Sequence, residues 1–231
     1  MDVSLTDSLA SVAVTDAPVA SVGKRTRRLI GLVRLSWRWF RLGLAATAGY
    51  LVGSVLTADV VSAAARRRSG ESVDLRATGS GNPGAANAIA NLGTGWGIAV
   101  LAGDLLKGAA GAQAGRIIAG DNGAYLAATA AVAGHCFPVW SGFRGGKGVA
   151  TSAGTTLVCF PAYVPVDVGL VGLSWFASRH AGKATAVASI AFVGAAYAWK
   201  RFRLPNAWGT KPTGGLPLYA CLLYTSDAAD E

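Results

Sequence analysis

Apolar runs of membrane length constrain the fold of this chain more than any other feature. A transmembrane helix needs about 20 mainly apolar residues. Gly, Ala, Ser and Thr recur within the runs, as close helix packing in lipid requires. We therefore predict an all-α, polytopic membrane helix bundle with about five to six spans. The expected spans are 42–58 (extended by 59–65), 96–119, 122–140, 149–175 and 182–199, with a shorter run at 216–224.

The low charge content supports a bilayer as the solvent. Only 14% of the residues are charged and the mean hydropathy is +0.41, whereas soluble domains carry about 25% charged residues. The net charge of +9 fits nucleic acid or an anionic membrane surface. Because the basic residues flank apolar runs, we expect contact with the lipid bilayer and not with nucleic acid.

The cysteines and histidines indicate no metal site. Cys136, Cys159 and Cys221 are odd in number and lack the spacing of metal ligands, and the chain has only two histidines. Small buried thiols are the expected role. We predict no metal and no cofactor.

The N-terminal region is expected to lie outside the bundle. Residues 1–23 lack the charged start and apolar core of a signal peptide and are predicted to be a disordered extension. Residues 24–41 contain seven basic residues among apolar ones. Because Arg34, Arg38 and Arg41 share one helical face, we expect an interfacial helix on anionic headgroups rather than a DNA-binding arm. The arginines at 66–68 favour a cytoplasmic first loop, although the basic segment 24–41 argues for the opposite orientation.

Two glycine-rich segments each precede an apolar run. Residues 79–87 read GSGNPGAAN, and residues 143–148 read FRGGKG. In the first, Asn82 is expected to cap a helix whose first residue is Pro83. A helix that begins at such a turn presents unpaired N–H groups and a positive dipole end, which favour a phosphate.

Neither segment fits a soluble nucleotide-binding motif. Residues 79–84 match GxGxxG, and Asp104 follows at the distance of a ribose-binding acid. However, no apolar strand precedes Gly79, and Asp104 lies within an apolar run. The second segment has Ser141 where a P-loop has its first glycine, and Gly148 where it needs Ser or Thr.

Ionisable residues inside or at the ends of the apolar runs are further candidates for functional residues. Asp104 and Lys107 are three residues apart and therefore neighbours on one helix face. They form either an internal ion pair or a functional site, and function is favoured because such residues are costly in lipid. His135 is close in sequence to Arg144 and Lys147, so both a structural and a catalytic role stay open. Asp167 could pair with a basic residue or cap a broken helix.

Taken in order, the motifs resemble those of the bacterial acyl-phosphate:glycerol-3-phosphate acyltransferase family (PlsY). Four motifs in this order are more specific than any one of them. They are Gly53-Ser54, then Asp74-Leu-Arg76 with residues 79–87, then Asp104-Leu-Leu-Lys107-Gly108, and finally Gly134-His135-Cys-Phe137-Pro138 followed by Gly145-Gly146-Lys147-Gly148-Val-Ala-Thr151.

The resemblance implies an enzyme of the bacterial cytoplasmic (inner) membrane with its active site facing the cytoplasm. It would transfer a fatty acyl group from acyl phosphate to the sn-1 hydroxyl of glycerol 3-phosphate, giving lysophosphatidic acid and phosphate. Acyl-CoA and acyl carrier protein would not be direct donors. The alternatives are a small transporter or channel for a phosphate-bearing anion, whose glycine loops line the path, and a non-catalytic scaffold.

The resemblance also implies roles for individual residues. The catalytic group would be Lys107, His135 and Ser80. Phosphates would be bound by Ser54, Arg76, Gly79, Gly81, Asn82, Gly84, Asn87, Gly145, Gly146, Lys147, Gly148 and Thr151. Glycerol 3-phosphate would contact Ser54, Lys107 and Arg76, the last in a bidentate manner. The two glycine segments would hold acyl phosphate. Because the donor's own phosphate can take the hydroxyl proton, His135 would orient a substrate.

Some positions depart from the family pattern. Val55 replaces a proline, Ala86 a threonine and Cys136 an asparagine. A further span and an H-x-x-N-I-x-R-L segment are expected after the last run, but the chain ends in polar residues. We therefore expect a basic N-terminal extension (1–41), an incomplete acyltransferase domain (42–220) with five to six of about seven spans, and a non-native tail (221–231). A chain truncated in this way could be inactive.

Overall fold

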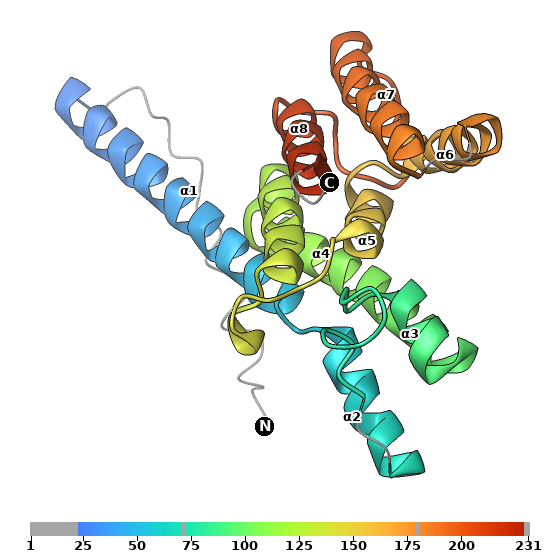
Figure 1. The fold of residues 1–231 in the computed structure, drawn as a ribbon. Coiled ribbons are helices and arrows are strands. Elements are labelled where there is room, and N and C mark those ends of the chain that lie inside the picture. The colour runs from blue at the N-terminus through green and yellow to red at the C-terminus, as the bar shows by residue number, and fades with distance from the viewer. Residues whose placement is uncertain (1–22, 71–72, 179–180, 229–231) are drawn as a thin grey trace, which may run out of the picture. The chain divides into compact units, whose positions relative to one another are not determined.

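The computed structural model describes residues 23–70, 73–178 and 181–228, and within these ranges all regular structure is helical. The predicted all-α class is therefore confirmed. The predicted disordered extension lies almost entirely outside the described residues. The order of the helices can be followed in Figure 1. They are α1 (Lys24–Gly53), α2 (Thr57–Ser69), α3 (Ala85–Leu92), α4 (Thr94–Cys136), α5 (Val149–Cys159), α6 (Val164–Ser178), α7 (Ala181–Phe202) and α8 (Gly215–Ala228), with short 3-10 helices at Val139–Ser141 and Pro161–Tyr163.

Residues 1–38 and 39–231 form two separate compact units. In the first unit, the described part of α1 exposes apolar side chains, among them Leu32 and Val33. The predicted end of an interfacial helix at residue 41 is wrong, because α1 continues without a break to Gly53. The second unit contains every element discussed below.

The first predicted span is broken. The run 42–65 was expected to be continuous, but α1 ends at Gly53 and α2 begins at Thr57. At the break, the backbone N–H and the hydroxyl of Ser54 both donate to the carbonyl of Tyr50, at 2.9 and 2.8 Å. The break frees the carbonyl of Val55 for another partner.

Helix α4 consists of two arms that fold back on one another. The runs 96–119 and 122–140 were predicted as separate spans, and the backbone leaves helical geometry between them, at Ala119 and Gly120. Gly120 has φ 68°, a conformation that glycine adopts without steric cost. A carbon added at Gly115 would overlap the backbone of Gly123, so the arms approach each other closely.

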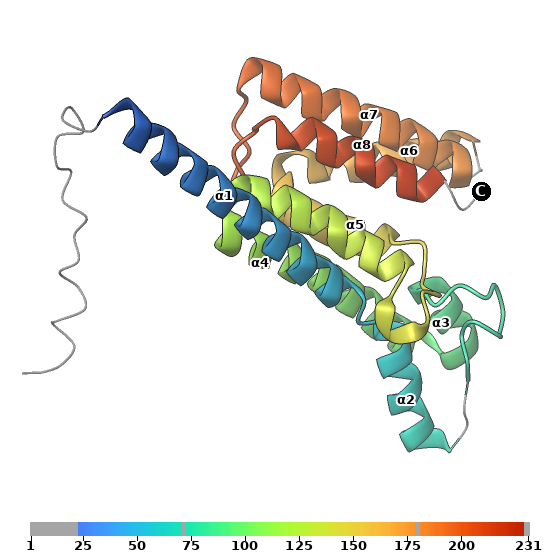
Figure 2. The ribbon, with the colours of Figure 1, turned by 90° about the vertical axis from the view of Figure 1, so that its left-hand side faces the viewer.

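The part of α1 in the second unit (residues 39–53) and α5 also lie directly on α4. A side-chain carbon at Gly53 would overlap the backbone of Ala131, and one at Gly108 would overlap the backbone of Thr151. Such contacts let helices pack in lipid through small residues. Helix α5 packs against α4, and Figure 2 shows α8 running alongside α7.

We expect Gly53→Val to destabilise the fold. The added side chain would enter backbone atoms of Ala131, and overpacking of this kind costs at least about 1–3 kcal/mol. Thermal unfolding of the purified protein in detergent should show a clearly lower midpoint. Gly43→Val is the matched control, because no atom lies within 4 Å of a carbon added at Gly43. Equal midpoints for the two variants would contradict the close approach of α1 to α4.

The segment 149–175, predicted as one span, is not one continuous helix. Helix α5 ends at Cys159, and the following helical segment is bent from it by 113°. The cause is Pro161, because the residue before a proline avoids the α region and Phe160 has φ −145° and ψ 53°. Asp167 lies in the first turn of α6, where the positive end of the helix dipole favours a carboxylate.

Length and composition identify fewer bilayer-spanning helices than we predicted. Within the described residues, the stretch Thr26–Ser69 passes this test, and the bent pair Val149–Cys159 and Pro161–Leu170 is a second candidate if it counts as one span. The number of spans therefore stays a prediction.

Two hydrophobic clusters fix the helices around the candidate site. An aromatic cluster joins α4 and the α5–α6 bend to α7 and α8, with Phe160 at its centre and neighbouring ring centroids 5.3–5.7 Å from it. A smaller cluster includes Ala58, Val61, Leu75, Ala88 and Val100. It holds α2, α3 and the segment between them against the first arm of α4.

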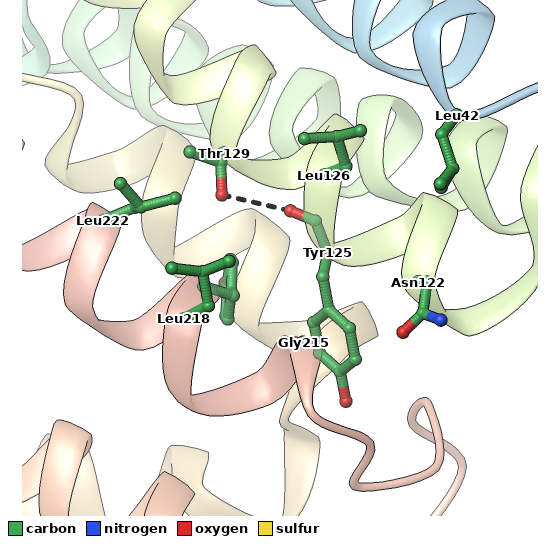
Figure 3. Close-up of a pocket in the computed structure, with 9 residues that line it drawn as sticks. Leu42, Asn122, Tyr125, Leu126, Thr129, Gly215, Leu218 and Leu222 are labelled. Atoms are coloured by element: carbon green, nitrogen blue, oxygen red, sulfur yellow. Dashed lines mark hydrogen bonds between the residues drawn. The ribbon is translucent and has the colours of Figure 1, made fainter. Parts of the chain in front are cut away.

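A cavity of about 210 Å³ lies between α1, the second arm of α4 and α8 (Figure 3). It contains none of the predicted site residues, and Tyr125 on its wall precedes His135 by ten residues, or roughly 15 Å of helix. The candidate site therefore lies elsewhere. The lining residues are Leu42, Asn122, Tyr125, Leu126, Thr129, Gly215, Leu218, Tyr219 and Leu222.

Candidate active site

A buried charged cluster forms where the α1–α2 break meets both arms of α4. Lys107 Nζ lies 2.9 Å from Asp104 Oδ1 and donates to the carbonyl of Val55, also at 2.9 Å. The hydroxyl of Thr57 donates to the same carboxylate oxygen at 3.0 Å, and His135 Nδ1 is 3.5 Å from it. Asp104, Lys107 and His135 are each at most 8% exposed. Charges buried this deeply need such partners, and the pair expected from the spacing is present.

The break in the first span creates this cluster. Had the run 42–65 been one helix, the carbonyl of Val55 would have bonded within it, and Lys107 would have lost an acceptor. Gly134 contributes as well, because a side chain there would overlap the carbonyl of Tyr50 and crowd Ser54. Ser54, which is fully buried, and His135 are thereby brought to the same place.

Two buried polar atoms, His135 Nδ1 and the hydroxyl oxygen of Thr151, make no regular hydrogen bond to a described residue, although the first of them lies 3.5 Å from Asp104 Oδ1. A buried polar group left unsatisfied costs about 1–3 kcal/mol. Thr151 lies against Gly108, the neighbour of Lys107. The site thus has unused hydrogen-bonding capacity that a polar ligand could satisfy.

Asn87 organises the first glycine segment from within. Its Nδ2 donates to the carbonyls of Leu75 and Thr78, at 2.8 and 2.9 Å. Its Oδ1 accepts the N–H of Ser80 at 3.1 Å and Asn91 Nδ2 at 2.9 Å. The side-chain amide of Asn87 therefore makes these hydrogen bonds to other groups of the protein. In the structure Asn87 shapes the segment, and its expected contact with a phosphate stays a prediction.

The glycines of this segment have conformational roles. Gly79 and Gly81 have φ 63° and 72°, and a side chain at Gly79 would overlap Asn87 Oδ1. Ser80, between them, is exposed. Its hydroxyl lies 3.5 Å from the N–H of Asn82, the limit of a hydrogen bond.

The predicted helix cap at Asn82 is wrong. Helix α3 begins at Ala85, its N-cap is Gly84, and Pro83 lies before the helix. The N–H of Gly84 donates to the carbonyl of Asn82 at 2.8 Å, so the chain makes one more turn before it becomes helical. The side chain of Asn82 consequently faces the second glycine segment.

The second segment is fastened to the end of α4. The N–H of Gly145 donates to the carbonyl of Cys136 at 3.1 Å, and that of Gly146 to the carbonyl of His135 at 3.2 Å. These bonds satisfy carbonyls that a helix end leaves open. The two amides expected to cradle a phosphate are therefore used within the protein. Helix α5 begins at Val149 as expected, after Gly148 with φ 81°, and Lys147 is exposed beside it.

Gly146 marks the point where the segments meet. A carbon added there would lie 2.5 Å from His135 Nε2 and 3.3 Å from Asn82 Oδ1. The first glycine segment, the second one and His135 thus share one location. Our hypothesis required the two segments to serve one reaction, and the structure places them close enough to do so.

Arg76 is held by a residue that the sequence analysis did not single out. Its Nη1 and Nη2 donate to the two carboxylate oxygens of Asp59, at 2.7 and 2.9 Å, and its Nε donates to the carbonyl of Arg144 at 2.8 Å. The hydrogen bond to Asp59 raises the pKa of Arg76 above its ordinary value. The bidentate geometry that we expected for a phosphate is occupied by a carboxylate. The only signal for Asp59 was an acid at the start of an apolar run.

Asn87→Ala should loosen the first glycine segment. The substitution removes both donated hydrogen bonds and leaves the N–H of Ser80 unpaired, at about 1 kcal/mol for each bond. We expect faster protease cleavage within residues 73–84 and weaker binding of a phosphate ligand. Asn91→Ala removes hydrogen bonds to the side-chain oxygen and the backbone carbonyl of Asn87 but leaves the bonds from Asn87 to the segment, so it should have a much smaller effect. Unchanged cleavage in both variants would contradict the organising role of Asn87.

The comparisons with known proteins bear directly on this arrangement. The sequence model of a family described as glycerol-3-phosphate acyltransferase matches residues 43–225. The chain belongs to the glycerol-3-phosphate acyltransferase family. The N-terminal boundary of the match lies just after the basic segment 24–41.

Curated relatives carry the same family name. The glycerol-3-phosphate acyltransferase of Rubrobacter xylanophilus is 42% identical over 146 residues, which cover 62% of this chain and 69% of the relative. That of Shouchella clausii is 45% identical over 132 residues, covering 54% and 61%. Glycerol-3-phosphate acyltransferase 1 of Moorella thermoacetica is 43% identical over 112 residues, covering 48% and 57%. The matched region thus spans less than two thirds of the length of some relatives.

Solved structures of an integral membrane member share the fold. The glycerol 3-phosphate form of PlsY has a TM-score of 0.64 and 25% identity, covering 81% of this chain and 86% of PlsY. Its lysophosphatidic acid form has a TM-score of 0.62. The predicted membrane helix bundle and the predicted acyltransferase class are confirmed. Family membership favours the enzyme over the transporter and the scaffold.

Proposed function

We propose that this acyltransferase moves a fatty acyl group from acyl phosphate to the sn-1 hydroxyl of glycerol 3-phosphate. An ester bond forms between the hydroxyl oxygen and the acyl carbon, and the bond between that carbon and the phosphate oxygen breaks. The leaving phosphate takes the hydroxyl proton, so the products are lysophosphatidic acid and inorganic phosphate. The relative PlsY is known in glycerol 3-phosphate and lysophosphatidic acid forms.

The observation that carries the proposal is the meeting of both glycine segments beside the buried Lys107 cluster. Lys107 has three N–H donors, and two of them are directed at Asp104 and the carbonyl of Val55. The third would bind the phosphate of glycerol 3-phosphate, together with Arg76 and with Ser54, whose hydroxyl would turn from the carbonyl of Tyr50 to the phosphate. A cation in a low-dielectric site binds a dianion strongly because water screens it little.

Acyl phosphate would lie across the two glycine segments. Asn82, Ser80 and the exposed Lys147 would contact its phosphate, and the first N–H groups of α5, including that of Thr151, would favour its negative charge. Gly79, Gly81, Gly84, Gly145, Gly146 and Gly148 would give the backbone its shape. His135 would orient the acceptor hydroxyl. The acyl chain would extend into the bilayer of the bacterial inner membrane, with the site on the cytoplasmic side.

Reconstitution tests the proposal. The chain in lipid nanodiscs would receive radiolabelled glycerol 3-phosphate and palmitoyl phosphate. We expect labelled lysophosphatidic acid and an equal amount of phosphate, and no product when palmitoyl-CoA replaces palmitoyl phosphate. Product from the CoA thioester, or none from acyl phosphate, would overturn the proposed donor. Binding of glycerol 3-phosphate, measured separately by calorimetry, reports on the acceptor site without turnover.

A further inference from the structure

Asp59 joins the three parts of the chain that build the site. It lies in the first turn of α2, and its carboxylate receives both terminal nitrogens of Arg76 from the segment before α3. The same carboxylate accepts the hydroxyl of Ser141, in the connection between α4 and α5, at 2.8 Å. One side chain thus links α2 to both glycine-bearing connections.

Arg76 depends on these partners for its orientation. It lies outside helices, in the irregular segment between α2 and α3, so helical geometry does not direct its side chain. Asp59 supplies two of the hydrogen bonds to its guanidinium, and the carbonyl of Arg144 supplies a third. A second carboxylate, Asp74, is 3.9 Å from Nη1 and much more exposed.

The remaining donors of Arg76 have a defined direction. A guanidinium has five N–H groups in a rigid planar fork, and the contacts above use three. With Asp59 at the end of the fork and the carbonyl of Arg144 at Nε, one N–H on each terminal nitrogen is left, and the two lie on opposite edges of the fork, each able to meet a ligand oxygen. Fixing the plane of the fork in advance lowers the entropy lost when a phosphate binds.

We propose that Asp59 is a positioning residue that aims Arg76 at the phosphate of glycerol 3-phosphate. The proposal rests on the proposed function, because it assigns the Arg76 partner to the acceptor substrate. Asp59 acts through Arg76 and does not contact the substrate. Ser141 donates to Asp59 Oδ2, the oxygen that also accepts Arg76 Nη2, and because it adds one neutral hydrogen bond it contributes more weakly.

Steady-state kinetics of the reconstituted protein test this role. We expect Asp59→Asn to raise KM for glycerol 3-phosphate about tenfold, the effect of weakening one charge-assisted contact, with kcat within about twofold. Asp59→Glu should restore most of the affinity, and Ser141→Ala should raise KM only about twofold. Asp121→Asn removes a carboxylate whose partners are the Arg116 side chain and the backbone N–H of Lys211, and it should leave KM unchanged.

A double-mutant cycle shows whether Asp59 acts through Arg76. In an Arg76→Ala background, Asp59→Asn should change KM by less than about twofold, because coupled residues are not additive. An undiminished effect in that background would overturn the proposal. A lower KM in Asp59→Asn would also overturn it, since the carboxylate would then compete with the substrate for Arg76.

The two proposals fail in different ways. If the acyl donor is assigned wrongly, the parent protein gives no product from acyl phosphate. Calorimetric binding of glycerol 3-phosphate should still follow the order parent, Asp59→Glu, Asp59→Asn from tight to weak. If only the role of Asp59 is wrong, the parent protein turns over and Asp59→Asn keeps its KM.

Discussion

Lys107→Met should lower turnover with acyl phosphate and glycerol 3-phosphate by at least about 100-fold, the typical loss when one preorganised donor in a buried site is removed. Lys107 is 8% exposed and has one N–H left for a phosphate after its bonds to Asp104 and the carbonyl of Val55. Methionine keeps much of the side-chain volume but cannot donate. Calorimetric binding of glycerol 3-phosphate should weaken in parallel.

Lys107→Met should also lower the stability of the protein, so the experiment must distinguish a loss of stability from a loss of catalysis. Without Lys107, the carboxylate of Asp104 stays buried, and its remaining partners among the described residues are Thr57 and His135. Breaking a buried ion pair costs about 3–5 kcal/mol. The double variant Asp104→Asn with Lys107→Met removes both charges. We expect its unfolding midpoint to recover while its turnover stays low. Recovery of turnover as well would show that Lys107 serves only the fold.

Gly146→Ala should reduce turnover by about 100-fold or more, since displacement of reacting groups by about 1 Å can cost that much. The added carbon would lie 2.5 Å from His135 Nε2 and 3.3 Å from Asn82 Oδ1. It would therefore displace the His135 ring and press against Asn82 at the point where the two glycine segments meet. The φ of Gly146 is not positive, so the effect would be steric.

Gly194→Ala is the matched control for this substitution. No atom lies within 4 Å of a carbon added at Gly194, and alanine is preferred to glycine in a helix by about 1 kcal/mol. We expect unchanged turnover and equal or higher stability. If Gly146→Ala also retained turnover, the two segments could not share a reaction site.

The helical class and the relevant polar residues could be predicted from the sequence because lipid imposes strong rules. Charges within apolar runs need partners, so Asp104 with Lys107 was recognisable from spacing alone. The start of α5 at Val149 and the interruption of α4 near residue 120 followed from glycine placement. The order of four motifs then identified the family, which a single motif could not do.

The positions of backbone breaks and the long-range hydrogen-bond partners could not be predicted from the sequence. The run 42–65 contains no sequence signal for a helix break at Ser54. The break accompanies the packing of Tyr50 and Ser54 against Gly134, which is distant in the sequence. The partnership of Asp59 with Arg76 and Ser141 joins residues up to 82 positions apart. The backbone amides of Gly145 and Gly146 were assigned to a ligand, but they donate to carbonyls at the end of α4. The sequence does not show that this helix end lies beside the two glycines.

A structure of the chain in lipid with bound glycerol 3-phosphate would test the central claim most directly. We predict the phosphate within hydrogen-bonding distance of Lys107 Nζ and the Arg76 guanidinium, with the glycerol hydroxyls toward Asn82 and Gly146. A phosphate bound elsewhere, for example beside the cavity at Leu42 and Tyr125, would contradict the account. So would a complex in which Asn82 and Gly146 lie too far apart to contact the same ligand.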